Sequence, residues 1–420
     1  MTSSGGNKVE EAYVWVWLPG SYNPVVAGRL APGEGGLQFN YAKSYLERKD
    51  AMALYAPELP LEVGALPLLK GLTMPGCIRD ASPDAWGRRV IINRMLGRRG
   101  SAVDTNELDE ITYLLKSGSN RIGALDFQSS PVNYAPRYVA EATLEELLAS
   151  AARVENGVPL SAELDQALNH GTAIGGARPK AQINDENAQY IAKFSSTNDL
   201  HNIIKAEFIA MRLAALLGLQ AAKVKLTRAA GEDVLLVERF DRLQTSQGWQ
   251  RKAMVSALTL FELDEMMARY ASYETLAEII RHRFNDHSEA LRELFSRMVF
   301  NILCGNTDDH ARNHAAFWDG QTLRLTPAYD ICPQPRGGNQ ASQAMLITGN
   351  DRRSLLATCL QAARHFFLSD VQARAIIERQ VNDIRAHWPT VCEEAELSQV
   401  DRGLLWERAI LNPSVFEGFK

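Results

Sequence analysis

The sequence lacks the features that mark membrane, secreted and disulfide-rich proteins. No apolar run reaches the roughly 20 residues that a membrane-spanning helix needs, and the polar start, MTSSGGNK, has no apolar signal-peptide core. We therefore expect a cytoplasmic protein with no membrane partner. The five cysteines are odd in number, scattered and without a Cys-x-x-Cys pair, which argues against a disulfide framework or a thiolate zinc site; they are Cys77, Cys304, Cys332, Cys359 and Cys392.

The chain also lacks an excess of positive charge. Its formal net charge is -5 at pH 7, so any contact with nucleic acid would depend on a local basic patch. The apolar share of 46% and the charged share of 23% are ordinary for a globular protein. No internal repeats or low-complexity tracts are present. With 420 residues the chain is long enough for two domains or for one domain of two lobes.

A change in composition predicts where these domains divide. Short runs rich in aromatic and branched residues recur near the N-terminus and predict a β-rich part. A polar stretch with two prolines, at 129–137, is the best candidate for a boundary. We therefore expect one domain at 1–130 and a second at 138–420. Within the second, we expect an N-lobe at about 138–242 and a mostly helical C-lobe at about 243–420.

A helix is predicted near the end of the first domain. Ser82-Pro83-Asp84 reads as a helix start, with Ser82 as the N-cap. Its buried stripe would consist of Trp86, Val90, Ile91 and Met95.

The most informative part of the chain follows a second predicted helix. Apolar residues recur at helical spacing from Leu291 to Leu303, and Gly305 ends the pattern. The next stretch, NTDDHARN, holds Asp308 and Asn313 five positions apart, which is the spacing of a kinase catalytic loop. In such loops the aspartate accepts the proton of the substrate hydroxyl and the asparagine gives an oxygen ligand to magnesium.

Alternatives exist for this stretch. Asp309 competes with Asp308 for the catalytic role, although only Asp308 has the five-residue offset to Asn313. The stretch also fits a surface loop in which Asp and Asn form turns. His310 and His314 are four apart, as zinc ligands on a helix can be, but the sequence here does not favour a helix. We expect His310 to support the loop beside the nucleotide rather than to bind zinc.

Asp330 is the candidate for a second magnesium ligand. Asp319-Gly320, between two strand-like runs, is a strong hairpin signal. Helix, polar loop, hairpin and then aspartate is the order found in the C-lobe of a protein kinase. The residues after Asp330 are Ile331-Cys332 rather than Phe-Gly, so a eukaryotic-type kinase is not expected. The alternative is an ordinary turn aspartate after Pro327.

Two segments in the middle of the chain could bind nucleotide phosphates. Lys193 lies in the strand-like run 191–194, and Glu207 in the next predicted helix could form the ion pair that positions it. An edge-strand lysine is the alternative for Lys193. The segment 174–180 is rich in glycine, with N–H groups that favour anions. Its candidate phosphate-binding residues are Gly175, Gly176, Ala177, Arg178 and Lys180, although it is not a Walker A sequence and an ordinary turn is the alternative.

A third segment could bind the base. Glu238 and Phe240 follow a strand-like run, and their backbone could be the hinge that hydrogen-bonds adenine. A salt bridge at the strand end is the alternative for Glu238.

Together these residues resemble those of the HipA family of bacterial toxin serine/threonine kinases. The DASPDAWGRR run at 80–89 and the strands before it resemble the family's N-terminal domain, so the likeness covers nearly the whole chain. The resemblance implies an α+β, protein-kinase-like bilobal fold with an additional β-rich N-terminal domain and a mostly helical C-terminal lobe. The kinase-domain motifs stand in the family's order: GGARPKA at 175–181, IAKF at 191–194, VERFDR at 237–242, NTDDHARN at 306–313 and PAYD at 327–330.

The resemblance also implies roles for single residues. Asp308 would be the catalytic aspartate, and Asn313 and Asp330 would hold Mg²⁺. Lys193 would contact the phosphates of ATP. The segment 174–180 would cover these phosphates, and residues 238–240 would form the adenine hinge.

Partners follow from the same resemblance. The family phosphorylates protein serines, with aminoacyl-tRNA synthetases among its substrates, which stalls translation and favours dormancy. A small helix-turn-helix antitoxin of the HipB type usually neutralises the toxin, and the complex represses its own operon. We expect operator DNA to be bound mainly through the antitoxin, in keeping with the modest negative charge of this chain. The alternatives are a catalytically silent co-repressor and a small-molecule phosphotransferase.

One position departs from the family pattern. Relatives often carry a serine just ahead of the phosphate segment, and its autophosphorylation inactivates the enzyme through the added charge. The matching residue here is Ala173, preceded by Thr172. Either self-inhibition is absent, or Thr172 takes the phosphate, or the alanine is an engineered change.

Overall fold

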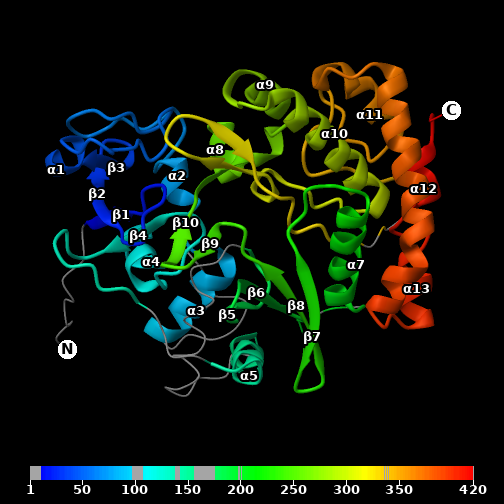
Figure 1. The fold of residues 1–420 in the computed structure, drawn as a ribbon, viewed down its shortest axis with the longest axis horizontal. Helices are drawn as coiled ribbons and strands as arrows, with labels where there is room; N and C mark the ends of the chain where they lie inside the picture. Colours follow the sequence, from blue (N-terminus) through cyan, green and yellow to red (C-terminus); the bar gives the residue numbers. More distant parts are fainter. Residues whose placement is uncertain are drawn as a thin grey trace. The chain divides into compact units, whose positions relative to one another are not determined.

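The computed structural model describes residues 11–96, 107–137, 142–155, 176–196, 199, 201–334, 336, 338 and 340–419. The chain forms two compact units (Figure 1). The first is made of residues 1–197 and 241–254, and the second of residues 198–240 and 255–420. The strand β11 (Ala253–Ser256) spans the last crossing from the first unit to the second.

The first unit begins with an antiparallel sheet of four strands in the order β3-β2-β1-β4, drawn mostly in blue in Figure 1. Branched and aromatic side chains favour these strands, and the central strand β1 is almost wholly buried. Phe39 and Tyr41, two residues apart on β3, pack edge to face with ring centres 4.7 Å apart. The elements of this part are β1 (Ala12–Val16), β2 (Val25–Gly33), β3 (Gly36–Tyr41), α1 (Lys43–Leu46), α2 (Gly76–Arg79), α3 (Ala85–Leu96), α4 (Glu110–Lys116) and β4 (Leu125–Gln128).

In its described residues, the rest of the first unit contains one helix and two hairpins. In the first hairpin β5 and β6 are antiparallel, and Lys180 lies directly opposite Lys193. In the second hairpin β9 and β10 are antiparallel. The elements are α5 (Leu144–Glu155), β5 (Lys180–Asn184), β6 (Gln189–Phe194), β9 (Arg242–Thr245) and β10 (Gly248–Arg251).

Helix α3 differs from its predicted form at both ends. It begins at Ala85, and Ser82 is a buried residue whose hydroxyl has no hydrogen-bond partner rather than an N-cap. The first hydrogen bond of the helix runs from the Arg88 N–H to the Asp84 carbonyl, at 2.9 Å, so Asp84 rather than Ser82 takes the N-cap position. Trp86 is buried as predicted, whereas Met95 in the last turn is 40% exposed.

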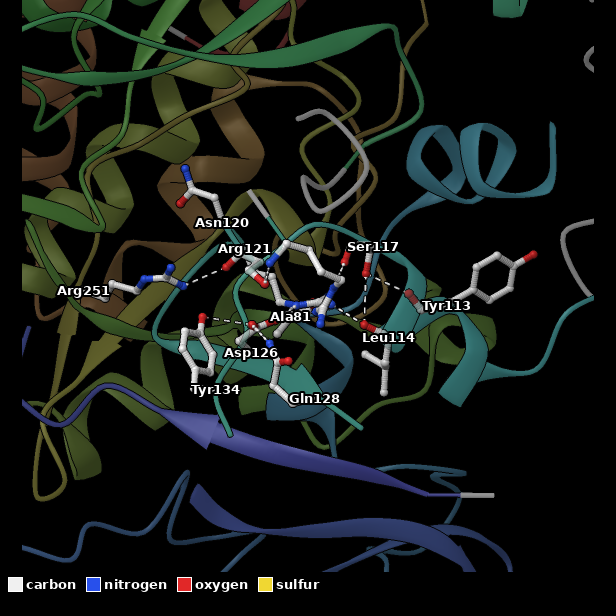
Figure 2. A network of polar contacts seen from close by, with 12 residues as sticks. Ala81, Tyr113, Leu114, Ser117, Asn120, Arg121, Asp126, Gln128, Tyr134 and Arg251 are labelled. Carbon is white, nitrogen blue, oxygen red and sulfur yellow. Dashed lines mark hydrogen bonds and ion pairs between the residues drawn. The ribbon is translucent and has the colours of Figure 1, made fainter. Parts of the chain in front are cut away.

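A buried ion pair supports the region between α4 and β4 (Figure 2). The Arg121 and Asp126 side chains are both fully buried and lie 3.0 Å apart. Arg121 also donates to the backbone carbonyls of Ala81 and Leu114. Burial alone would raise the pKa of Asp126, but the charges of Arg121 and Arg137 hold it below its ordinary value. Because each charge depends on the other, this network fixes the segment that follows α4.

The second unit is mostly helical. Helix α10 is buried along most of its length and contacts α9, α11 and α12, and α12 packs on α7. Two hairpins, β7–β8 and β12–β13, accompany the helices. The elements are α7 (Ile203–Leu216), β7 (Val224–Ala229), β8 (Glu232–Glu238), α8 (Ala257–Leu260), η2 (Glu265–Tyr270), α9 (Tyr273–Arg283), α10 (His287–Cys304), η3 (Ala311–Asn313), β12 (Ala315–Trp318), β13 (Leu323–Leu325), α11 (Leu356–Ala362), η4 (Ala363–Phe366), α12 (Asp370–Glu394), α13 (Gln399–Leu405) and η5 (Pro413–Phe416).

The predicted hairpin at Asp319-Gly320 is present. The Asp319 carboxylate accepts hydrogen bonds from the N–H groups of Gln321 and Thr322, at 2.9 and 2.7 Å, which closes the turn between β12 and β13. Within the described part of the chain, no helix is both long and apolar enough to cross a membrane.

Candidate active site

A sharp turn connects α10 to the loop that carries Asp308. Gly305 ends the helix in the left-handed region, with φ at 76°. A Cβ atom at this position would lie 2.6 Å from the carbonyl oxygen of Ala409, so only glycine fits. The next residue, Asn306, donates to Asn301 from its side chain at 3.0 Å and from its backbone at 2.8 Å. The loop therefore leaves the helix from a fixed point.

Backbone contacts hold Asp308 and Asn313 together. The carbonyl oxygen of Asp308 accepts hydrogen bonds from the His310 N–H, at 2.9 Å, and from the side-chain amide of Asn313, at 3.2 Å. The Asn313 N–H donates to the His310 carbonyl at 2.8 Å. Since the amide nitrogen of Asn313 is engaged within the loop, its side-chain oxygen is the candidate metal ligand.

The two neighbouring aspartates lie in opposite environments. Asp308 is exposed, whereas Asp309 is buried. The Asp309 carboxylate lies 3.0 Å from His314 Nε2 and accepts a hydrogen bond from the Tyr273 hydroxyl. Burial by itself would raise the pKa of Asp309, but the charge and hydrogen bond of His314 lower it overall. Only Asp308 can therefore reach a substrate, which favours the residue chosen from the spacing.

The Asp308 carboxyl has a raised pKa. Partial burial is the largest cause, and the negative charges of Asp330 and Asp309 add to it, while His310 opposes them. Asp330 thus disfavours the charged form of Asp308. Two like charges at close range favour the binding of a cation between or beside them.

Asp330 has an unusual backbone conformation. Its φ is 59°, in the left-handed region that aspartate adopts more often than most residues other than glycine. Two neighbours hold the segment: the Ala328 N–H donates to the Gln220 carbonyl at 2.7 Å, and the Tyr329 hydroxyl donates to the Arg312 carbonyl at 2.7 Å. The second contact connects the segment around Asp330 to the loop at 306–313, which contains Asp308 and Asn313. Such conformations are retained where the surroundings fix them, and they concentrate at functional sites.

Phe240 lies beside the same segment. Its ring centre is 5.6 Å from that of Tyr329 and 6.0 Å from that of Phe317. An apolar aromatic group therefore adjoins the residues around Asp330, as a site for a flat base requires.

Glu238 and Glu207 also belong to the second unit. Glu238 forms a salt bridge with Lys223, at 3.2 Å, which is the alternative that the sequence left open for its side chain. Its backbone N–H donates to the Lys223 carbonyl at 2.8 Å. Glu207 is buried on α7. Its pairing with Lys193, which belongs to the first unit, stays a prediction.

The phosphate-binding candidates of the first unit gather at the start of the β5–β6 hairpin. Lys180 and Lys193 are directly opposite on neighbouring strands, so their side chains leave the same face of the hairpin. The φ of Gly176 is 109°, and a Cβ atom there would lie 2.0 Å from the Lys180 ammonium nitrogen. The glycine therefore allows this cation to pack against the backbone. Like charges directly opposite each other repel, so this arrangement suits an anionic ligand.

Three of the candidates lie outside the described residues. They are Thr172, Ala173 and Gly175.

The second-unit residues fit a magnesium ion bound together with phosphates. Magnesium favours one or two carboxylates plus substrate oxygens over a cage made entirely by protein. Asp330 would supply a carboxylate and Asn313 a neutral oxygen, and the negative charges of Asp330 and Asp309 add to the burial that raises the pKa of Asp308. Among the described residues, no group of three or more His, Cys, Asp or Glu could hold a metal alone.

Sequence reasoning missed the residues that support the loop from behind. Tyr273 on α9 and the Asp309–His314 pair fix the loop from inside, and Glu265 of η2 holds Arg312 through a 2.8 Å ion pair. No local pattern marks Tyr273 or Glu265, because they are 36 and 47 positions away from their partners in the loop.

Comparison with known families gives two matches. The HipA N-terminal domain matches residues 16–128, and the HipA-like C-terminal domain matches residues 172–388, which is more than half of the chain.

Individual relatives agree with these matches. The chain is 27% identical over 203 residues to a protein of Haemophilus influenzae named "Putative kinase", and 25% identical over 158 residues to the serine/threonine-protein kinase toxin HipA of Shewanella oneidensis. These alignments cover 43% and 34% of this chain, and they span 59% and 36% of the relatives' own lengths. The chain thus aligns with less than two thirds of the length of each of these relatives.

A solved structure matches nearly the whole chain. It is the complex of Shewanella oneidensis HipA with HipB and operator DNA, with a TM-score of 0.68, 17% identity, and coverage of 96% of this chain and 99% of the other. This likeness confirms the predicted α+β fold of HipA type. With matches to both domains of the family, and with one of them covering more than half of its length, the chain is a member of the HipA family.

Proposed function

We propose that this protein is an ATP- and magnesium-dependent protein serine/threonine kinase. The observation that supports the proposal is a pair of hydrogen bonds: the Asn313 side-chain amide donates to the Asp308 carbonyl, and the Tyr329 hydroxyl, next to Asp330, donates to the Arg312 carbonyl. An exposed carboxylate beside an amide oxygen and a second carboxylate is the set that phosphoryl transfer uses.

Asp308 would act on the substrate hydroxyl. Its carboxylate accepts a hydrogen bond from the serine or threonine hydroxyl and orients that oxygen toward the γ-phosphorus. The oxygen forms a bond to phosphorus as the bond to the ADP oxygen breaks, and the hydroxyl proton passes to Asp308. The buried contacts of Asp309 keep the loop in place, so Asp308 need not be reorganised during transfer.

The remaining candidates would bind the nucleotide. Asn313 and Asp330 would hold Mg²⁺, which when bound neutralises charge on the phosphates. Lys193 and the Gly176–Lys180 segment, including Arg178, would contact the phosphates, and Gly175 is proposed to take part with them. Phe240 and the backbone near Glu238 would adjoin the adenine, with Glu207 orienting Lys193 and His310 supporting the loop.

The biological role is proposed from the relatives. One of them is named as a kinase toxin, and the matched structure holds HipA together with HipB and operator DNA. We propose the same assembly here, with this protein as the toxin of a type II toxin–antitoxin pair located in the cytoplasm. Its partner would be a HipB-like antitoxin with a helix-turn-helix, and operator DNA would be bound mainly through that partner. A translation component such as an aminoacyl-tRNA synthetase is the proposed substrate class. We also propose that the chain divides into an N-terminal domain at 1–130 and a kinase domain at 138–420.

A comparison of phosphoproteins after brief expression tests this function. Cells expressing the wild type should gain phosphoserine or phosphothreonine on one or a few proteins, and cells expressing Asp308→Ala should not. Asp370→Ala is the matched control, because Asp370 is an exposed aspartate at the start of α12, away from the loop. Equal phosphoprotein patterns for the wild type and Asp308→Ala would reject the assignment. Label on a sugar or other alcohol, with none on protein, would favour a small-molecule phosphotransferase.

A further inference from the structure

The start of helix α3 holds the glycine-rich segment by four hydrogen bonds. Asp84 accepts a hydrogen bond from the Gly176 N–H. The Trp86 backbone N–H donates to the Gly176 carbonyl at 3.2 Å, and its indole N–H donates to the Lys180 carbonyl at 3.1 Å. The Arg89 guanidinium donates to the Ala177 carbonyl. All of these residues belong to the first unit.

The contacts join two segments that are distant in sequence. Asp84 and Gly176 are 92 positions apart, and Trp86 and Lys180 are 94 positions apart. Trp86 is fully buried, and the Arg89 guanidinium lies 5.5 Å from its ring centre. The N–H groups in the first turn of a helix have no partner within the helix, so Gly176 satisfies one that α3 would otherwise leave open. The hydrogen bond from the Trp86 N–H to Gly176 therefore caps the first turn of α3.

The contacts also set the direction of the neighbouring N–H groups. A trans peptide places the carbonyl of one residue and the N–H of the next on opposite sides. Because the carbonyls of Gly176 and Ala177 point to α3, the N–H groups of Ala177 and Arg178 point away from it. The Lys180 ammonium packs against Gly176 beside them. Successive N–H groups that point the same way near a lysine can bind an anion.

We propose that Asp84, Trp86 and Arg89 are positioning residues for the phosphate segment, so that the N-terminal domain shapes the nucleotide site. This inference rests on the proposed kinase function. The N–H of Gly176 donates to Asp84 and is therefore not a phosphate donor.

Steady-state kinetics and nucleotide binding test the proposal on the full-length protein. Arg89→Ala and Asp84→Ala should each raise KM for ATP and Kd for a non-hydrolysable ATP analogue with Mg²⁺ by about tenfold, since each loses a hydrogen bond that involves a charged group. The kcat at saturating ATP should change by less than about twofold, because a fault in ground-state binding leaves the chemical step intact. Asp84→Asn keeps an acceptor oxygen and should restore most of the affinity.

Arg94→Ala is the matched control. Arg94 lies on the same helix, is half-buried like Arg89, and also donates to a backbone carbonyl, that of Lys116 at 2.8 Å. It should leave KM and Kd unchanged. Hydrogen exchange gives a readout independent of activity: the peptide covering 176–181 should exchange faster in Arg89→Ala than in the wild type or Arg94→Ala, while peptides from α12 stay the same.

The outcomes separate this inference from the function on which it rests. If the wild type binds the analogue and transfers phosphate, and Asp84→Ala and Arg89→Ala match it in KM and in exchange, the positioning role is wrong and the kinase assignment stands. A lower KM in Asp84→Ala would also overturn the inference, because Asp84 would then compete with the nucleotide. If the wild type itself neither binds the analogue nor transfers phosphate, the proposed function fails and the inference falls with it.

Discussion

The Asp309 carboxylate lies 3.0 Å from His314 in the interior, although its chain neighbour Asp308 is exposed. One peptide bond thus separates a residue that faces solvent from one that anchors the loop. Because one aspartate faces solvent and the other is buried, we expect their replacement to affect the stability of the protein differently.

Asp309→Ala should lower the free energy of unfolding by about 3 kcal/mol, because it leaves His314 and the Tyr273 hydroxyl buried without their shared partner. Asp308→Ala should change it by less than about 0.5 kcal/mol, as expected for an exposed side chain. Urea denaturation of both variants beside the wild type measures the difference. Equal losses in the two variants would contradict the proposed anchoring role.

The contribution of Asp309 should depend on pH with a definite sign. Its pKa in the folded protein is lowered, so its stabilising effect is full above the pKa of the unfolded carboxyl, about 3.9, and is lost as pH falls through the folded value. The stability difference between wild type and Asp309→Asn should therefore be constant from pH 7 to about pH 5 and shrink in stronger acid. A difference that grows on acidification would contradict this.

The pKa of Asp308 should fall when Asp330 loses its charge. Asp330 raises that pKa in the folded protein, so Asp330→Asn should shift the Asp308 titration to lower pH, and Mg²⁺ with nucleotide should shift it the same way in the wild type. Carboxyl-carbon NMR with labelled aspartate reports the shift, with Asp308→Asn to assign the signal. An unchanged titration in Asp330→Asn would mean that the two carboxyls do not interact.

Gly305→Ala should destabilise the protein more than Gly218→Ala. Both glycines follow helices with φ near the same value, 76° and 81°, so both substitutions carry the left-handed penalty of about 1–2 kcal/mol. Only at Gly305 would the new Cβ meet backbone, at 2.6 Å, whereas nothing lies within 4 Å at Gly218. Thermal unfolding of the pair isolates the cost of the close contact. Equal melting temperatures would show that the loop adjusts without cost.

Two sequence patterns with a fixed local spacing predicted local structure best. The five-residue offset from Asp308 to Asn313 reflects one continuous turn, and the Asp319-Gly320 signal reflects one hairpin, so both were visible in short stretches. Helix α10 and its stop at Gly305 were predicted for the same reason.

Features that depend on tertiary contacts could not be predicted. The start of α3 at Ala85, the left-handed backbone of Asp330 and the Tyr273–Asp309 contact are set by packing between distant segments. The sequence pattern marks Asp84 only as a residue at the start of a helix, and it does not indicate the hydrogen bond that Asp84 accepts from Gly176.

The alanine at position 173 leads to a prediction about self-modification. Alanine cannot accept phosphate, so after incubation with Mg²⁺ and ATP the peptide covering 171–181 should carry no added phosphate. Mass spectrometry of the purified protein measures this. The Ala173→Ser variant serves as the positive comparison and should acquire phosphate if the segment reaches the active site. Phosphate on Thr172 of the unchanged protein would contradict the prediction.

The most direct test of the central claim is phosphoryl transfer from ATP to serine or threonine by the purified protein, in the presence and absence of Mg²⁺. The account predicts transfer that requires Mg²⁺ and that falls about a hundredfold or more in Asp308→Ala, while Asp308→Ala still binds nucleotide and Asp370→Ala behaves as the wild type. Transfer by Asp308→Ala at the wild-type rate would contradict it.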